Sequence, residues 1–133
     1  MSETIVLDAS AVLALMNGEP GQEEVADVLA DALLSAVNLA EVVSKLAERG
    51  MPAAEALADT LSLGMRVIPM DAALAGIVGS LRPLTRAAGL SLGDRCCLAL
   101  AQQRGALVLT CEQAWAPLAP ALGLRIRNVR PER

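Results

Sequence analysis

The stretch Ile5-Val6-Leu7-Asp8-Ala9-Ser10, near the start of the chain, decides the fold. Three consecutive apolar residues without polar alternation are typical of a strand covered on both faces, and the spacing over residues 9–16 predicts a helix directly after it. Asp8 is therefore expected at the point where a strand gives way to a helix. Ligands of open parallel sheets bind outside the carboxyl ends of the strands, so Asp8 is a candidate site residue.

The composition favours one ordinary domain, and we expect a single domain over residues 1–133. The hydrophobic fraction of 54% includes one Trp and no Phe or Tyr, so Ala, Leu and Val provide most of it. Helices packed closely on a sheet suit such a composition, with Trp115 in the core beside the last strand. Aromatic stacking on bases is excluded, so a nucleic acid would have to be held through its phosphates.

The net charge of -4 argues against a protein that coats nucleic acid by bulk electrostatics. Nearly all the basic residues are nevertheless Arg, which makes bidentate phosphate contacts. Arg125, Arg127, Arg130 and Arg133 cluster late in the chain, where they could form a basic face. The alternative is a solvated edge strand followed by a tail.

The three cysteines, Cys96, Cys97 and Cys111, form neither a disulfide framework nor a zinc pattern, and we expect them to be small buried apolar residues. The N-terminal segment contains Glu3 and lacks the basic region of a signal peptide, and no apolar run is long enough to cross a membrane. We therefore expect a protein of the reducing cytoplasm with no membrane partner.

Short apolar runs alternate with helical spacing along the chain. The pattern predicts strands over 5–7, 34–37, 66–70, 106–110 and 124–127, and helices over 9–16, 23–33, 38–49, 51–64, 71–81, 92–104 and about 113–118. Strands that alternate with helices in this way indicate an α/β fold with a largely parallel sheet of about five strands.

Four acids share one position in this pattern. Asp8, Glu41, Asp94 and Glu112 are each expected at or just inside the N-terminal end of a helix. Helix capping explains each acid taken singly, with Asn38 as the cap before Glu41. Right-handed crossovers, however, place these helix ends along one edge of the sheet, so the four carboxylates should face one crevice.

Carboxylates that converge require a cation, because two unit charges about 4 Å apart repel by roughly 4 kcal/mol at an effective dielectric near 20. Mg²⁺ and Mn²⁺ prefer oxygen ligands and retain water. The chain has no histidine, which excludes a His-based hydrolase and removes the usual zinc ligands. A metal-activated water could instead attack a phosphodiester.

Four motifs together resemble a known family. They are Val6-Leu7-Asp8-Ala9-Ser10, Asn38-Leu39-Ala40-Glu41, Leu90-Ser91-Leu92-Gly93-Asp94 and Leu109-Thr110-Cys111-Glu112-Gln113-Ala114-Trp115. In this order and over nearly the whole chain they resemble the PIN domain, specifically the VapC-like ribonuclease toxins of type II toxin-antitoxin pairs. The resemblance implies a three-layer fold with strand order 3-2-1-4-5 and a Mg²⁺- or Mn²⁺-dependent endoribonuclease. It also implies a homodimer and a cognate antitoxin whose tail covers the acidic site.

By that resemblance Asp8, Glu41 and Asp94 would be the metal-binding acids, and Glu112 would take the fourth acidic position. The family usually has Asp where Glu112 stands. The extra methylene moves this carboxylate outward, which bears on whether a second metal is held.

Several neighbours of the acids have candidate roles. Ser10 and Thr110 would be polar groups that bond a ligand carboxylate or a metal-bound water. Arg95 follows Asp94 and could meet a substrate phosphate or an antitoxin carboxylate, with a surface ion pair as the alternative. Lys45 lies four residues after Glu41, a spacing that favours an ordinary ion pair on one helix face.

Three other functions can be compared with this one. A phosphatase of the haloacid dehalogenase kind needs a second Asp where Ser10 stands and a lysine other than Lys45. A receiver domain could use Asp71 as its phosphoacceptor, but it needs an acidic pair after the first strand and a late lysine. A catalytically degenerate PIN-like domain that only binds protein is the main alternative, and Asp94→Asn discriminates because it abolishes cleavage only in an enzyme.

Overall fold

Five parallel strands run through the middle of the molecule in the order β3-β2-β1-β4-β5. This computed structural model describes residues 3–130. The strands are β1 (Ile5–Leu7), β2 (Ala32–Ser35), β3 (Arg66–Ile68), β4 (Leu107–Thr110) and β5 (Arg125–Asn128). The central strand is β1, where Val6 lies opposite Leu33 on one side and Val108 on the other. The expected parallel sheet and strand order are confirmed.

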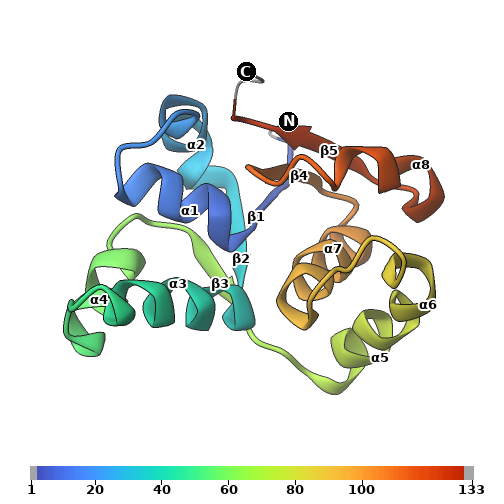
Figure 1. The fold of residues 1–133 in the computed structure, drawn as a ribbon, viewed down its shortest axis with the longest axis horizontal. Helices are drawn as coiled ribbons and strands as arrows, with labels where there is room; N and C mark the ends of the chain where they lie inside the picture. Colours follow the sequence, from blue (N-terminus) through green and yellow to red (C-terminus); the bar gives the residue numbers. More distant parts are fainter. Residues whose placement is uncertain (1–2, 131–133) are drawn as a thin grey trace.

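Helices cover both faces of the sheet, which makes three layers (Figure 1). One face carries α1 (Ala9–Met16), α2 (Gln22–Val28), α3 (Ala36–Glu48) and α4 (Ala53–Leu61). The other carries α5 (Ala72–Ser80), α6 (Arg82–Thr85), α7 (Leu92–Arg104) and α8 (Ala119–Leu122). Two 3-10 turns, Leu29–Asp31 and Ala116–Leu118, complete the elements of the described residues.

The central strand supplies both hydrophobic cores, because successive side chains of a strand point to opposite faces. Ile5 and Leu7 pack into the core under α1 and α3, whereas Val6 packs into the core under α5 and α7. Trp115 is buried in the second core, as expected. The three cysteines are buried and free, which confirms their expected packing role.

The join between α2 and β2 differs from the expectation. The helix predicted over 23–33 ends at Val28, and the strand predicted over 34–37 begins already at Ala32. The short apolar run that begins at Ala32 also fits a helical spacing. It forms a strand because Ala32 pairs with Ile5 in the sheet. Since the strand starts and ends two residues early, the next helix also starts early.

The cap of α3 is consequently Ser35, and the prediction that Asn38 caps this helix is wrong. The Ser35 hydroxyl accepts a hydrogen bond from the backbone N–H of Asn38 at 3.0 Å. Glu41 therefore lies in the second turn of α3, not in the first as expected.

The helix predicted over about 113–118 does not form as such. A turn is followed by the 3-10 segment and then by α8, because Pro117 and Pro120 lack the N–H groups that a continuous helix needs. Glu112 thus precedes a turn. The segment predicted as a strand over 66–70 forms β3 only as far as Ile68.

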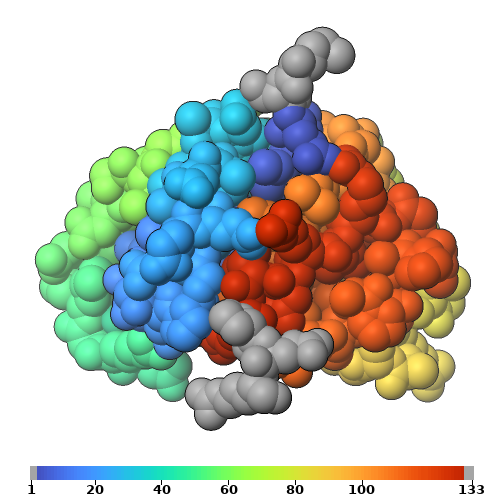
Figure 2. All heavy atoms as spheres, turned by 90° about the horizontal axis from the view of Figure 1, so that it is seen from above, coloured from blue at the N-terminus to red at the C-terminus, as the bar shows by residue number. Residues whose placement is uncertain are grey.

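The late arginines do not form an open basic face. Arg125 pairs with Glu3, Arg127 with Glu24, and Arg130 Nη2 lies 3.7 Å from Glu19 Oε1. Arg133 lies outside the described residues. Figure 2 shows the blue atoms of the α2 region beside the red atoms near the end of the described chain, in the middle of the view. The alternating strand at the edge of the sheet is therefore tied to the rest of the chain by ion pairs.

A tight backbone contact supports this junction. Gly21 has a φ of +97°, and a Cβ there would stand 2.7 Å from the carbonyl oxygen of Val129. Val129 in turn donates its N–H to the Thr110 carbonyl at 2.9 Å. None of the helices within residues 3–130 combines the length and the apolar character that a membrane crossing requires.

Candidate acidic site

The four predicted acids line one hollow of about 210 Å³. Asp8 follows β1, Glu41 lies on α3, Asp94 on α7, and Glu112 follows β4. The remaining lining comes from polar or small neighbours of these acids: Ala9, Ser10, Asn38, Lys45 and Ser91. The expected convergence of these residues on one crevice is present in the structure.

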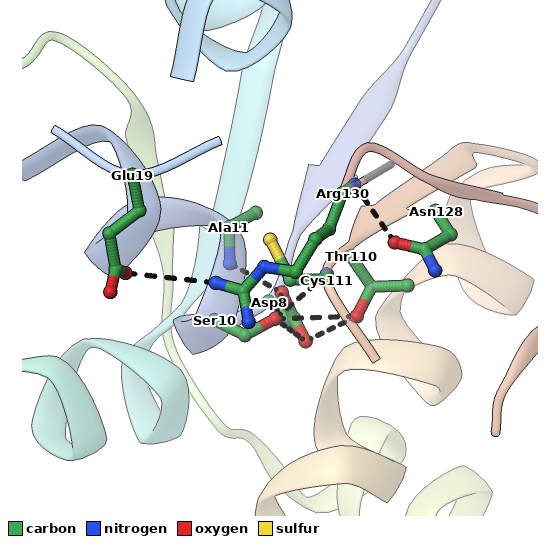
Figure 3. A network of polar contacts seen from close by, with 8 residues as sticks. All are labelled: Asp8, Ser10, Ala11, Glu19, Thr110, Cys111, Asn128 and Arg130. Atoms are coloured by element: carbon green, nitrogen blue, oxygen red, sulfur yellow. Dashed lines mark hydrogen bonds and ion pairs between the residues drawn. The ribbon is translucent and has the colours of Figure 1, made fainter. Parts of the chain in front are cut away.

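Asp8 is the most firmly held of the four acids (Figure 3). It caps α1, because its Oδ1 accepts the backbone N–H of Ala11 at 2.9 Å. The Ser10 hydroxyl lies 2.8 Å from both carboxylate oxygens, and the Thr110 hydroxyl donates to Oδ2 at 2.7 Å. Ser10 and Thr110 thus bond an acid of the pocket.

Burial changes the acidity of Asp8, which is only 3% exposed. Loss of solvent raises the pKa of its carboxyl group from 3.8 to about 6. The hydrogen bonds from Thr110, Ala11 and Ser10 oppose this rise in pKa, and the negative charge of Glu112 adds to it. The pKa of Asp8 therefore lies about one pH unit below neutrality.

Glu41 is held by a residue whose role the sequence reasoning did not find. Asn38 donates through Nδ2 to Glu41 Oε1 at 2.6 Å and to the carbonyl oxygen of Gly93 at 3.0 Å. The signal was the three-residue spacing from Asn38 to Glu41, which becomes a contact between neighbouring turns only when the helix starts before Asn38.

Asp94 and Glu112 are placed by backbone contacts. The expected capping box is confirmed: Asp94 N–H donates to Ser91 Oγ at 3.1 Å, and Ser91 N–H donates to Asp94 Oδ2 at 2.9 Å. Glu112 is exposed, and its backbone N–H donates to the Thr110 hydroxyl at 2.9 Å. Glu112 is the one exposed residue among the four acids.

The two basic neighbours behave differently from the expectations. Lys45 lines the hollow, but within the described residues its ammonium group makes no ion pair with Glu41 at 4.0 Å or less. Arg95 lies outside the hollow, where Nη1 donates to the Val78 carbonyl at 3.2 Å and the buried Nε has no hydrogen-bond partner among residues 3–130. The position of Arg95 between α5 and α7 argues against both a substrate contact and a surface ion pair.

The donor chemistry of the hollow fits a hard divalent cation, because its acids offer only oxygen atoms. The spacing is wider than a ligand set requires. Among residues 3–130, no three Asp, Glu, His or Cys side chains stand close enough together to hold one metal ion. One or two of these carboxylates together with water molecules would complete the coordination of Mg²⁺, which keeps several waters when it is bound to proteins.

The fold and this hollow together define a class: an α/β domain with a parallel sheet in the order 3-2-1-4-5 and carboxylates gathered where its strands end. The PIN domain family model matches residues 5–119. This chain belongs to the PIN domain family, and the resemblance noted in the sequence is confirmed.

Solved structures of toxin-antitoxin proteins share this fold. DNA-bound VapBC from Salmonella typhimurium is 20% identical, with a TM-score of 0.71 over 95% of this chain and 98% of that chain. A toxin-antitoxin complex from Klebsiella pneumoniae is 17% identical, with a TM-score of 0.69 over 85% and 91%. VapC20 of Mycobacterium tuberculosis, described as a sarcin-ricin loop cleaving toxin, is 20% identical, with a TM-score of 0.71 over 96% and 100%. No curated protein matches the sequence.

Proposed function

We propose that this protein is a metal-dependent endoribonuclease toxin that hydrolyses RNA phosphodiester bonds through metal-activated water. The observation that carries the proposal is the meeting of four carboxylates, from four separate segments, at one hollow of a PIN domain. Such a concentration of negative charge has a chemical use when a divalent cation is held there.

Asp8, Glu41, Asp94 and Glu112 are the residues that would hold Mg²⁺ or Mn²⁺. The cation would lower the pKa of water and offset the charge of the phosphodiester. Asp8 would have to be ionised for this role, and its carboxylate is kept in place by hydroxyl donors that leave its charge intact.

Substrate binding follows from the few positive groups near the hollow. Lys45 is the basic residue in its lining, and no carboxylate of residues 3–130 takes it into an ion pair. We assign its ammonium group to an RNA phosphate, since the chain has a single aromatic residue and that residue is buried. This acidic protein would then bind RNA at this site through only a few contacts.

A cognate antitoxin is the expected protein partner. Similarity to VapBC and to the Klebsiella pneumoniae toxin-antitoxin complex supports this part of the proposal. An antitoxin tail with basic side chains would neutralise the acidic hollow. A homodimer and a cytoplasmic location complete the proposal.

Cleavage of RNA by the antitoxin-free protein tests the function. Purified protein is incubated with total RNA in Mg²⁺, in Mn²⁺ and in EDTA, beside Asp94→Asn as the inactive control. We expect cleavage by the wild type in the presence of metal only. Cleavage in EDTA, equal cleavage by Asp94→Asn, or no cleavage by the folded wild type would each overturn the proposal.

One observation favours a second candidate, a catalytically degenerate PIN domain that acts as a protein-binding module. It is the wide spacing of the acids, no three of which in the described residues are within reach of one ion. In that case Asp94→Asn would leave antitoxin binding and every RNA profile unchanged.

A further inference from the structure

Asn38 makes more contacts than a helix start requires. Its side chain belongs to a residue only 1% exposed, and each of its polar atoms has a partner. Oδ1 accepts from the Ser35 hydroxyl at 2.8 Å, and Nδ2 donates to Glu41 and to the Gly93 carbonyl. Ser35 already caps α3 through the Asn38 backbone N–H, so the two bonds from Nδ2 serve another purpose.

The orientation of this amide follows from chemistry. Nδ2 faces a carboxylate and a carbonyl, both of which only accept hydrogen bonds, whereas Oδ1 faces a hydroxyl that can donate. The reversed amide would set an oxygen against two acceptors. The amide therefore clamps α3 to α7, and its bond to Glu41 is strengthened by the carboxylate charge.

Gly93 forms the other side of the clamp. A Cβ at this position would stand 2.7 Å from Glu41 Oε2, far inside van der Waals contact. The Glu41 carboxylate thus occupies space that any other residue type would fill. Gly93 directly precedes Asp94 on α7, so the contact also fixes Glu41 relative to Asp94.

We propose that Asn38 is a positioning residue that holds the Glu41 carboxylate in its metal-binding place, with Gly93 as the cradle. The inference rests on the proposed function for the assignment of Glu41 to a metal. A glutamate on a helix surface has several rotamers, and one that is fixed beforehand loses less freedom when it binds an ion. Removal of the clamp should therefore weaken metal binding while the fold stays intact.

Mn²⁺ binding to the antitoxin-free protein, followed by electron paramagnetic resonance of the free ion, provides the test. Asn38→Leu keeps the size of the side chain and removes its N–H donors. We expect the Kd for Mn²⁺ to rise roughly 10- to 100-fold, the range typical for the loss of a group that orients a metal ligand. Thr60→Val is the matched control, because it removes a buried hydroxyl bond on α4 that lies away from the hollow.

A double-mutant cycle separates positioning from general loosening. If Asn38 acts through Glu41, Asn38→Leu should add nothing to the Kd of Glu41→Ala. The same factor in both backgrounds would show a structural effect and overturn the inference.

Gly93→Ala tests the cradle with a change that favours the helix. We expect a weaker affinity for Mn²⁺ together with an unchanged or higher Tm, because Ala is a better helix former than Gly. A purely structural role would move both quantities in the same direction.

The outcomes separate the two proposals. A wild-type protein that binds no Mn²⁺ overturns the proposed function and this inference with it. The inference alone is overturned by a different result. In that result the wild type binds Mn²⁺ and Glu41→Ala weakens the binding, but the Kd of Asn38→Leu stays within about twofold of the wild-type value. If the Gly93→Ala variant binds Mn²⁺ with wild-type affinity, Gly93 has no part in positioning Glu41.

Discussion

Two corners of the acidic hollow fix a carboxylate in different ways. The strand corner consists of Asp8, Ser10 and Thr110, and the helix corner consists of Asn38, Glu41 and Gly93. At the strand corner the acid is buried, and its backbone position follows from the end of β1 and the start of α1. At the helix corner a longer, less buried side chain depends on one amide and one missing Cβ.

The two corners differ in how burial affects the acidity of the carboxylate that they hold. Burial at the strand corner gives a fixed carboxylate at the expense of a raised pKa. The helix corner avoids deep burial and relies on contacts between two helices. We therefore expect the strand corner to respond to pH and the helix corner to respond to small changes of shape.

The largest effect is expected from Asp8→Asn, which removes the charge of the strand corner. We expect cleavage to fall by roughly 10²- to 10³-fold or more, as for other groups that stabilise developing charge. The measurement is the rate of RNA cleavage in Mn²⁺. Cleavage that stays within a few-fold of the wild type would show that Asp8 serves only as a helix cap.

The same variant should be more stable than the wild type in EDTA at pH 8. The folded state binds the Asp8 proton up to a pKa of about 6 and the unfolded state only to about 3.8, so ionisation between these values disfavours the folded state. The full difference corresponds to at most about 3 kcal/mol. We expect a Tm gain for Asp8→Asn at pH 8 that shrinks as the pH falls from 6 toward 4, and an equal Tm difference at both ends would contradict it.

The next effect concerns Mn²⁺ affinity as a function of pH. Since Asp8 must lose its proton to bind a cation, affinity should fall about tenfold per pH unit below its pKa and level off above about pH 7. Asn38→Leu should lower the whole curve without moving its midpoint. A midpoint that moves in Asn38→Leu would mean that the two corners are coupled.

Thr110→Val should shift the strand corner more modestly. The Thr110 hydroxyl is the strongest of the groups that lower the pKa of Asp8, so its removal should raise that pKa and move the midpoint of Mn²⁺ binding to higher pH. The buried Asp8 Oδ2 and the Glu112 N–H both lose a partner, at a cost of about 1–3 kcal/mol in the free energy of unfolding. A pH titration of binding and a urea melt measure the two effects, and an unmoved midpoint would contradict the first.

Ser35→Ala should give the smallest effect. It removes the cap of α3, worth about 1 kcal/mol, and the hydroxyl that Asn38 Oδ1 accepts. Because Nδ2 keeps both of its acceptors, we expect Mn²⁺ affinity to change by less than in Asn38→Leu. A larger loss in Ser35→Ala than in Asn38→Leu would show that the cap, not the amide, positions Glu41.

The sequence was sufficient to predict the place of Asp8 in the strand corner. An unbroken apolar run followed by a capping acid places Asp8 from local pattern alone, and the observed bounds of β1 and α1 agree with the prediction. The capping box of Ser91 and Asp94 was equally visible, because both partners lie within four consecutive residues.

The helix corner could not be predicted in the same way. The segment before α3 fits a helical spacing, and only its pairing with β1 makes it a strand that ends at Ser35. Because of this two-residue shift, Asn38 does not cap α3, and its side chain instead connects α3 to α7. This connection joins residues 55 positions apart, and the cradle at Gly93 is defined by a side chain from another helix. Such contacts depend on how helices pack, which local pattern does not contain.

The central place of β1 also sets when, during synthesis, the hollow can exist. Asp8 is among the first residues to be synthesised. The strand before it, β1, pairs on one side with β4, and the Thr110 hydroxyl that donates to Asp8 lies 102 positions later in the chain. A nascent chain that already contains Asp8, Glu41 and Asp94 therefore still lacks the strand that buries the first of them. We expect the hollow to form only after residue 112 has been made and β4 has joined the sheet.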